Sequence, residues 1–321
     1  METVWLAWVF VVVIVVGCLG NLLSLYVFSR PHMRTASISV FLCALSFVDL
    51  VLLILAVPTF VAPYEQFWEY GRLDTRRSTF LAHVWKFVYP VNLTMQTCSV
   101  YVMVMITLER WTAVCRPLQV RACYTPRKSA FILLIIFTSA CAYNFIRFFE
   151  YRLKHTKNFA YVTTWLRDSE KYWWYYVGYY TVLYNLTHFL IPFSIIAVAN
   201  VQIIVVLYRS SQTRHKLTGQ QQREHSTTLM LLCVTMVFVS CNTLPFILNI
   251  VEGVFPNVFV SSGEDDILIA NTMIDISNLL VVLNSTSTFV IYLFFSRKYC
   301  QTVTGLFNLK QQRPLRYSFM T

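Results

Sequence analysis

The chain has 321 residues, of which 57% are hydrophobic and 13% charged, and its formal net charge is +11. A water-soluble domain of this length carries about 25% charged residues, so the composition excludes an ordinary soluble protein and indicates a chain whose solvent is mostly lipid. A basic balance can also indicate nucleic acid. Here the positive charges are spread over the connections between long apolar runs, so we expect no nucleic-acid partner.

Seven apolar runs are each long enough to cross a hydrocarbon core, which takes about 20 helical residues. We therefore predict an all-α membrane protein: one seven-transmembrane helix bundle over residues 1–321, with a short amphipathic eighth helix on the membrane surface. The first run begins almost at Met1, so we expect neither a cleavable signal peptide nor an outer domain before it. The predicted spans are 5–29, 37–63, 86–112, 129–149, 175–207, 226–252 and 267–295, and the surface helix is 296–308.

The charges of the connections predict the orientation. More than half of the 26 Lys and Arg residues fall on one side of the bundle, where the only acids are Glu109 and Glu224. Positive side chains are retained in the cytosol, so we expect Met1 outside the cell and Thr321 in the cytosol. The outer connection 151–174 is itself basic, which weakens the count, but the acids support the same orientation.

The nine cysteines all fall within predicted spans or on the cytosolic side. Disulfides form in oxidising compartments such as the cell exterior, so we expect none. Cys300 follows the seventh span beside Arg297 and Lys298, where it could carry palmitate or serve only as a small interfacial hydrophobe. The six histidines are scattered along the chain, so we expect no histidine metal site.

Ionisable side chains interrupt the apolar runs at two places. Asp49 lies inside the second span, where a lone carboxylate is costly unless it is protonated, paired or bound to a cation, so we expect it to be functional. Glu109 and Arg110 end the third run. They are either a surface pair whose guanidinium reaches the headgroups, or a pair at the mouth of the bundle where Arg110 can change partners.

Two further features mark the third and sixth spans. Asn92, Gln96 and Ser99 recur at helical spacing and share one face of the third span. For Asn92 and Gln96, hydrogen bonding between helices and contact with a ligand are equally good interpretations. Pro245 lies in the middle of the sixth span, where it frees a backbone carbonyl and predicts a hinge.

Taken together, these features resemble the rhodopsin-like G-protein-coupled receptors over about residues 5–308. Three stretches are more specifically similar to the FMRFamide-type neuropeptide receptors of invertebrates. The residues that carry the broader resemblance are Asn21, Asp49, Glu109-Arg110-Trp111, Pro192, Pro245 and Tyr292. The more specific stretches are Tyr143–Glu150, Cys241–Leu244, and Asp275–Asn278 with Asn284-Ser285.

Several positions depart from the rhodopsin-like pattern. Trp111 stands where the Asp-Arg-Tyr triplet has its phenol, and Thr243 and Phe289 replace the Trp of Cys-Trp-x-Pro and the Pro of Asn-Pro-x-x-Tyr. The third helix has Trp85 where the family has a disulfide cysteine, and the outer loop 151–174 has no cysteine to pair with. We therefore expect packing to hold this loop.

The resemblance implies a switch driven by a ligand, with no bond chemistry. Asp49, Ser99, Asn284 and Ser285 would line a sodium pocket, in which Thr288 replaces the usual fifth partner. Hard oxygen donors around one carboxylate suit a small cation. We expect no cofactor and no metal ion besides this sodium.

The resemblance also implies the moving parts of the switch. At rest, Glu109 would hold Arg110. When a ligand binds, the sixth helix would swing about Pro245 and free Arg110 to meet the α subunit of a heterotrimeric G protein. Tyr292 would turn inward to support that state.

The ligand that the resemblance implies is an extracellular peptide ending in Arg-Phe-amide, a cation beside an aromatic ring. Outer-side carboxylates could receive its Arg and aromatic side chains could hold its ring, although surface acids are usually only solvated. The candidate ligand-binding residues are Asn92, Gln96, Glu150, Tyr179, Tyr184, Phe246, Glu252 and Asp275, with Trp173 and Glu264 as further candidates.

Three other functions can be compared with the sequence. A transporter would show inverted repeats and broken helices, but we find no self-similarity. An enzyme is not expected, because no Gly-x-Ser-x-Gly or His-Glu-x-x-His motif occurs. The main alternative is a receptor-like seven-helix protein that couples weakly or not at all to a G protein, because the Trp and Pro of two switch motifs are replaced.

Overall fold

The structure, a computed structural model, describes residues 4–30, 36–64, 73–156, 159–166, 171–213, 219–254 and 264–307. Within these ranges, seven helical stretches are long and apolar enough to cross a membrane. The predicted seven-helix membrane bundle is therefore confirmed. The stretches are Trp5–Phe28, Ser37–Val61, Arg76–Cys115, Pro126–Phe149, Trp174–Arg209, Thr227–Val254 and Leu268–Phe295.

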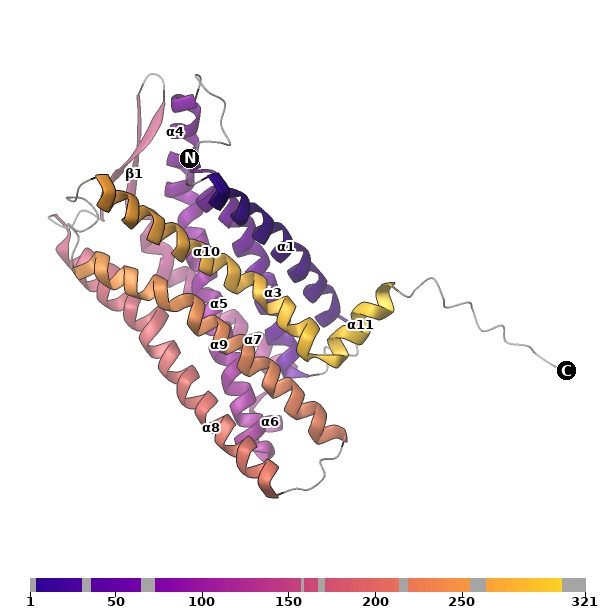
Figure 1. Cartoon of the computed structure of the whole chain (residues 1–321). Coiled ribbons are helices and arrows are strands. Elements are labelled where there is room, and N and C mark those ends of the chain that lie inside the picture. Colours follow the sequence, from indigo (N-terminus) through magenta and orange to yellow (C-terminus); the bar gives the residue numbers. More distant parts are fainter. Residues whose placement is uncertain are drawn as a thin grey trace.

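The long helices run side by side between two distinct ends of the bundle (Figure 1). The "hairpin end" carries helix α4 (Leu73–His83) and the antiparallel strands β1 (Tyr151–His155) and β2 (Ala160–Thr164). The "Arg110 end" carries the short helix α6 (Pro117–Cys123). The long helices are α1 (Val4–Phe28), α3 (Ser37–Ala56), α5 (Tyr89–Cys115), α7 (Pro126–Asn144), α8 (Ile191–Thr213), α9 (Gly219–Val254) and α10 (Glu264–Phe295).

Wider or tighter turns extend several of these helices toward the hairpin end. The π-helical segments are η1 (Val57–Val61), η3 (Val84–Val88), η5 (Trp174–Leu183) and η6 (Leu186–Leu190), and η4 (Phe145–Phe149) is a 3-10 turn. In η1 the cause is local: Pro58 has no N–H to donate, and the N–H of Ala62 bonds the carbonyl of Val57 at 2.9 Å.

Helices α1 and α10 approach closely because α1 presents glycine to α10. A Cβ atom on Gly20 would overlap the ring of Phe289, and one on Gly17 would overlap the side chain of Thr286. One turn further on, the Asn21 side chain donates to the carbonyl of Ser285 at 2.9 Å. Asn21 thus satisfies its amide inside an apolar helix, as a polar residue in hydrocarbon must.

Aromatic and cationic side chains hold the loop at the hairpin end. The ring of Trp85 lies 6.2 Å from that of Tyr151 on β1. Lys86 donates to the carbonyl of Tyr151 at 2.8 Å, and the backbone N–H of Ala160 on β2 donates to Thr79 on α4 at 3.0 Å. All nine cysteines lie in the described ranges and are free thiols, so these contacts stand where a disulfide would otherwise tie the loop.

Four elements differ from the sequence predictions or add to them. The third helix begins at Leu73 rather than near residue 86, and the sixth begins at Gly219 rather than at 226. Residues 151–164, expected as an irregular loop, form a β-hairpin. A helix, α11, occupies Arg297–Phe307 and buries Tyr299; that it lies on a membrane surface stays a prediction.

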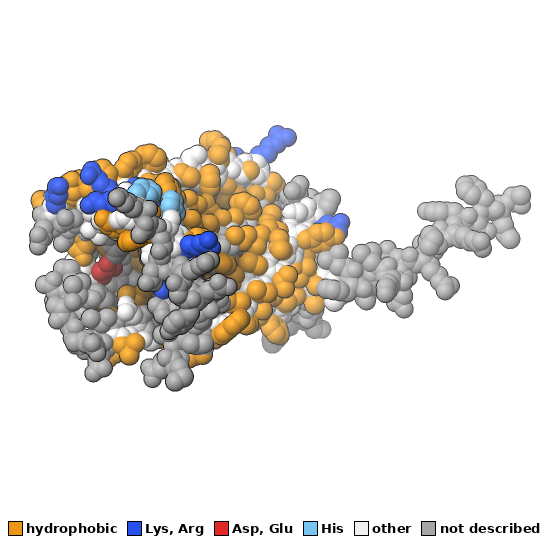
Figure 2. Space-filling view, turned by 90° about the horizontal axis from the view of Figure 1, so that it is seen from above, with side chains coloured by type: hydrophobic (Ala, Val, Ile, Leu, Met, Phe, Trp, Pro, Cys, Tyr) orange, Lys and Arg blue, Asp and Glu red, His pale blue; other side chains and the backbone are white. Residues whose placement is uncertain are grey.

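Apolar side chains cover the exposed flank of the bundle, as lipid contact requires. Figure 2, seen from above, shows a broad hydrophobic surface over the middle of the molecule, with His and several Lys and Arg on the left and further Lys or Arg at the opposite side. The fourth span is the most exposed of the seven, because only 17% of its most apolar stretch is buried within the bundle. Inside the bundle, the largest cluster of buried apolar side chains includes Phe41, Met103, Ile106, Phe238 and Tyr292.

Candidate functional site

At the Arg110 end, Glu109 and Arg110 form an ion pair on the last turns of α5. The Nη2 and Nε atoms of Arg110 lie 2.5 and 2.6 Å from Glu109 Oε2. The other carboxylate oxygen accepts a hydrogen bond from Ser37 on α3 at 2.8 Å. The Glu109 side chain is 2% exposed and that of Arg110 14%, so the carboxylate is enclosed by the bundle while the guanidinium reaches its mouth.

Trp111, the residue that departs from the Asp-Arg-Tyr pattern, faces the fifth span. Its indole Nε1 donates to Gln202 Oε1 on α8 at 2.5 Å, and the Arg116 guanidinium lies 5.3 Å from its ring centroid. The indole therefore links α5 directly to α8. A side chain shorter than tryptophan could make the same hydrogen bond only if α5 and α8 lay closer together.

A buried carboxylate lies between the two ends of the bundle. Asp49 is fully buried and accepts long hydrogen bonds from Ser99 on α5, 3.3 Å, and Thr288 on α10, 3.5 Å. The Ser285 hydroxyl lies near the same carboxylate and is buried without a hydrogen-bond partner among the described residues. No Lys or Arg pairs with Asp49 among the described residues, so nothing in this part of the chain neutralises its charge.

The oxygen donors around Asp49 fit a small cation. One carboxylate and three hydroxyl groups, from Ser99, Ser285 and Thr288, are hard ligands of the kind that alkali and alkaline-earth ions prefer. Asn284 lines the adjoining cavity next to Ser285. Four of the residues expected to form the sodium pocket thus lie together, and Thr288 joins them.

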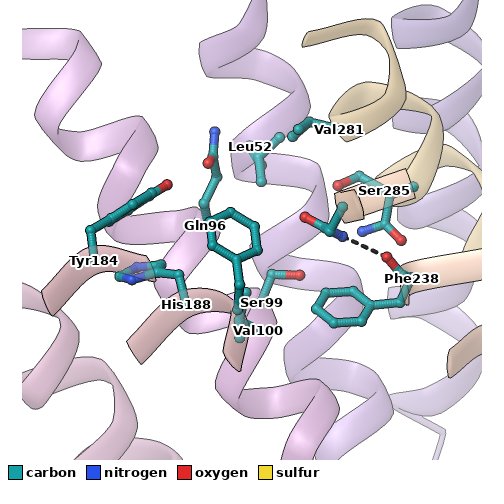
Figure 3. Close-up of a pocket in the computed structure, with 12 residues that line it drawn as sticks. Leu52, Gln96, Ser99, Val100, Tyr184, His188, Phe238, Val281 and Ser285 are labelled. Atoms are coloured by element: carbon teal, nitrogen blue, oxygen red, sulfur yellow. Dashed lines mark hydrogen bonds between the residues drawn. The ribbon is translucent and has the colours of Figure 1, made fainter. Parts of the chain in front are cut away.

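A small cavity of about 20 Å³ adjoins this cluster on the hairpin side. Figure 3 shows Tyr184, His188 and Gln96 on one side of it and Val281 and Ser285 on the other. Its polar lining also includes Asn242, whose side chain donates to the Phe238 carbonyl at 2.7 Å, drawn as the dashed line. The volume suffices for an ordered water molecule.

Of the polar residues on α5, Gln96 lines this cavity and Asn92 does not. Asn92 is fully buried, and its side-chain amide donates to Thr59 on η1 at 3.1 Å. It therefore ties α5 to the second span. Phe246, also expected near a ligand, packs on Phe189 with ring centroids 5.1 Å apart.

At the hairpin end, Arg147 and Glu150 form a second, almost completely buried ion pair. Arg147 Nη1 donates to Glu150 Oε1 at 2.9 Å, and the two side chains are 2% and 1% exposed. Tyr175 donates to the same carboxylate oxygen at 2.6 Å. Around the guanidinium lie the rings of Tyr179, Tyr180 and Tyr184, with centroids 5.3, 5.4 and 4.8 Å away.

This pairing changes the interpretation of Glu150. Glu150 was a candidate to receive the Arg of a ligand, but Arg147 and Tyr175 already occupy one of its oxygens. A ligand guanidinium could reach this oxygen only by displacing Arg147. Arg147, Tyr175 and His188 were not among the predicted site residues. Arg147 and Glu150 stand three residues apart at the end of an apolar run, a spacing that brings side chains together on a helix and could have indicated the pair.

The two other candidate acids contact residues other than Arg147. Glu252, at the end of α9, accepts a hydrogen bond from the Tyr180 phenol at 2.9 Å. Asp275, on α10, is half-buried and lies near Tyr64. Burial and the Asp275 carboxylate raise the pKa of Tyr64, so this phenol stays protonated over the physiological range. Tyr179 donates to the carbonyl of Tyr143 at 2.7 Å and thereby links η5 to α7.

The remaining predicted switch residues are packed in the bundle. Tyr292 is fully buried, with its ring 5.3 Å from Phe28 and 5.8 Å from Tyr299. Pro245 lies inside α9. Cys300 is half-buried on α11, and its thiol is free; its palmitoylation stays a prediction.

A family described as serpentine type 7TM GPCR chemoreceptor Srw matches residues 8–310. Since this match covers nearly the whole chain, the chain belongs to this family of seven-transmembrane G-protein-coupled receptors. The family consists of receptors, so a transporter is not favoured and the protein is not an enzyme.

Within that class, the chain is most informatively compared with peptide receptors. It is 56% identical over 292 residues to FMRFamide peptide receptor frpr-18 of Caenorhabditis elegans, a match that covers 91% of this chain and 66% of that receptor. It is 31% identical over 296 residues to the FMRFamide receptor of Drosophila melanogaster, covering 89% and 50% respectively. The predicted resemblance to FMRFamide receptors is confirmed, and the chain spans between half and two thirds of these relatives' lengths.

Proposed function

We propose that this protein is a plasma-membrane receptor for a neuropeptide of the Arg-Phe-amide type that signals to a heterotrimeric G protein. The observation that carries the proposal is the arrangement along α5. One rigid helix bears Gln96 at the inner cavity, Ser99 at the buried carboxylate and the Glu109–Arg110 pair at the far mouth. A ligand that displaces α5 or its neighbours from one end therefore acts on the ion pair at the other.

The proposed orientation has the hairpin end outside the cell and the Arg110 end in the cytosol. The excess of Lys and Arg and the scarcity of acids in the connections of the Arg110 end support it. The amino terminus is then extracellular and the carboxyl terminus cytosolic, with α11 along the inner leaflet.

The described structure corresponds to the resting state in this proposal. Arg110 is paired with Glu109, and Ser37 fixes the carboxylate from α3. Movement of α9 about Pro245 would open the mouth of the bundle and give Arg110 a partner on the Gα subunit. A ligand shifts such an equilibrium only by binding one state more tightly than the other.

Asp49 would hold a sodium ion together with Ser99, Ser285 and Thr288, with Asn284 at the edge of the site. The ion would supply the positive charge that the buried carboxylate lacks. These side chains come from the second, third and seventh spans, so a bound cation would draw the three helices together and favour the resting arrangement.

The Arg side chain of the peptide would pair with Glu252 or Asp275. Glu252 is supported by its position at the end of α9, the helix that has to move, and by its bond to Tyr180 in the tyrosine cluster. Asp275 is supported by its half-buried site on α10. Gln96, Tyr184 and Phe246 would meet the aromatic and amide end of the peptide deeper in the bundle.

The experiment that tests this function is a cell assay. The chain is expressed with a surface tag and challenged with a library of Arg-Phe-amide peptides while second messengers are recorded. A response at submicromolar peptide that disappears in Arg110→Ala supports the proposal. Silence at normal surface expression would contradict it and favour the weakly coupling receptor-like protein, in which Thr243 and Phe289 have removed the switch.

A further inference from the structure

Several buried polar atoms around the Arg147–Glu150 pair lack hydrogen-bond partners. Arg147 uses its Nη1 atom to bind Glu150 Oε1, and its Nε and Nη2 atoms are buried without a partner among the described residues. Glu150 Oε2 and Asn144 Oδ1 are buried and unpartnered in the same part of the chain. Since buried polar groups in folded proteins are nearly always hydrogen bonded, these four atoms indicate that a further polar group binds here.

The backbone places the three side chains on one face. Asn144 precedes the 3-10 turn η4, Arg147 lies at its centre and Glu150 follows it. In such a turn, side chains three residues apart lie one above the other. Within the planar guanidinium, the Nε and Nη2 atoms share one edge, so their N–H groups point the same way. The face therefore offers two donors and two acceptors, and its net charge is zero because Arg147 and Glu150 cancel.

A primary carboxamide has the complementary set of groups. Its carbonyl oxygen accepts two hydrogen bonds and its NH₂ group donates two. It can therefore pair with both free N–H groups of Arg147 and with Glu150 Oε2 and Asn144 Oδ1. A carboxylate only accepts hydrogen bonds, so it would leave both acceptors unpaired and add a second negative charge beside Glu150.

We propose that Asn144, Arg147 and Glu150 form an amide site, which binds the carboxyl-terminal carboxamide of the peptide. The inference rests on the proposed function and adds the residues that would distinguish an amidated peptide from its free acid. The Arg147–Glu150 ion pair stays intact when the carboxamide binds, because the carboxamide uses only the atoms that the pair leaves free.

Tyr184 contacts both the amide site and the inner cavity. Its ring lies 4.8 Å from the Arg147 guanidinium, and it lines the cavity beside His188 (Figure 3). Tyr179 and Tyr180 donate hydrogen bonds from their phenols, whereas the phenol of Tyr184 has no hydrogen-bond partner within the described ranges. Tyr184 is therefore the tyrosine of this cluster whose side chain turns most easily. Its rotation would connect the inner cavity, where the peptide end is proposed to lie, with Arg147.

The test compares one peptide in two forms on variants of the full chain. The Arg-Phe-amide peptide that gives the strongest response in the cell assay is also made with a free carboxyl terminus. On the parent chain the free acid should be about a hundredfold less potent, because two buried acceptors are left without partners. Asn144→Ala removes one of these acceptors. It should lower the amide-to-acid potency ratio about fivefold, the effect of one lost hydrogen bond.

Asn185→Ala is the matched control. Asn185 is also a buried asparagine whose Oδ1 atom lacks a partner, and its side chain donates two hydrogen bonds, as that of Asn144 does. It contacts Asn249 on α9 instead of the amide site, so its loss should leave the amide-to-acid ratio unchanged. Glu150→Gln removes the negative charge at the site and should raise the potency of the acid relative to the amide. If Glu150→Gln does not reach the cell surface, the two asparagine variants decide.

The possible failures are distinct. A parent chain that responds equally to amide and acid would overturn the proposal. An Asn144→Ala variant with the ratio of the parent chain would also overturn it, and would show that the buried atoms bind water only. If no peptide of the library gives a response, the proposed function fails and this inference fails with it.

Discussion

Each of the two ion pairs of this receptor consists of a glutamate and an arginine. Their surroundings decide whether the arginine can exchange its partner. Glu109–Arg110 lies at the mouth of the bundle, with the guanidinium 14% exposed. Arg147–Glu150 lies at the hairpin end, with both side chains almost completely buried and three tyrosine rings around the guanidinium. An arginine can exchange its carboxylate for another partner only where water or a protein can replace it. Arg110 meets this condition and Arg147 does not.

The difference assigns the two pairs different roles. Removing one member of a buried pair leaves an uncompensated charge in a low-dielectric site. We therefore expect Arg147 and Glu150, which both lie at the end of the fourth span, to act as a lock that holds Tyr175 of η5. Opening the pair at the Arg110 end costs less free energy, because solvent reaches the guanidinium. The first prediction tests the lock, the second tests the switch, and the later ones test the contacts between the two ends and beside the lock.

The largest effect is expected from Arg147→Met. This change leaves Glu150 buried without its counterion, which costs about 3–5 kcal/mol in comparable sites. The purified variant should melt at a much lower temperature, and little of it should reach the cell surface. The double variant Arg147→Met with Glu150→Leu, which removes both charges, should recover part of the loss. A variant that melts like the parent chain would show that the pair is no lock.

A smaller effect, on signalling rather than on stability, is expected from Glu109→Gln. A hydrogen bond to a charged group contributes roughly 1.5–3 kcal/mol, so removing the charge of Glu109 should raise basal nucleotide exchange on the G protein about tenfold. Folding should be preserved, because glutamine can still accept from Ser37. Ser37→Ala, which removes only the neutral partner, should raise basal exchange less. Unchanged basal exchange in Glu109→Gln would contradict the resting role of this pair.

The third prediction concerns the carboxylate between the two pairs. If Asp49 holds sodium, replacing KCl by NaCl at constant ionic strength should raise the melting temperature of the purified receptor. Asp49→Asn should abolish this difference between the two salts, and Ser99→Ala should reduce it. An equal melting temperature of the parent chain in both salts would show that Asp49 does not hold sodium. The roles proposed for the two ion pairs would be unaffected.

The fourth prediction concerns Trp85, whose contact with Tyr151 holds the hairpin. An aromatic pair contributes about 0.5–1.5 kcal/mol beyond burial, so Trp85→Ala should increase hydrogen exchange in β1 and β2 without a large change in global stability. Trp85→Phe should restore most of the protection. If exchange in the hairpin does not change, other contacts, such as those of Lys86, hold the loop.

The sequence predicted the bundle because hydropathy and span length are local properties. It did not predict that the third helix begins at Leu73, because the segment that follows, with Asp74, Arg76 and Arg77, is polar and has no apolar run to signal a span. The hairpin was missed for a similar reason. Its cross-strand pairs, such as Arg152 with Thr163, connect positions that no local pattern relates.

The site was predicted only in part, for physical reasons that differ between its members. Asp49 and Glu109–Arg110 stand out because a charge in an apolar run is costly. Arg147 and Glu150 stand at the boundary of a span, where charges are common. Tyr179 and Tyr184 were expected to contact a ligand, but their position around Arg147 could not be predicted. The segment η5 is π-helical, and its wider turn changes which side chains share a face.

In the proposed mechanism, Arg110 exchanges Glu109 for a partner on the G protein when the bundle opens. The most direct test is peptide-stimulated nucleotide exchange on a purified G protein by the reconstituted receptor and its Arg110→Ala variant, with peptide binding measured on the same samples. The account predicts that the variant binds the peptide with an affinity close to that of the parent chain and stimulates no exchange. Full stimulation by Arg110→Ala would contradict it.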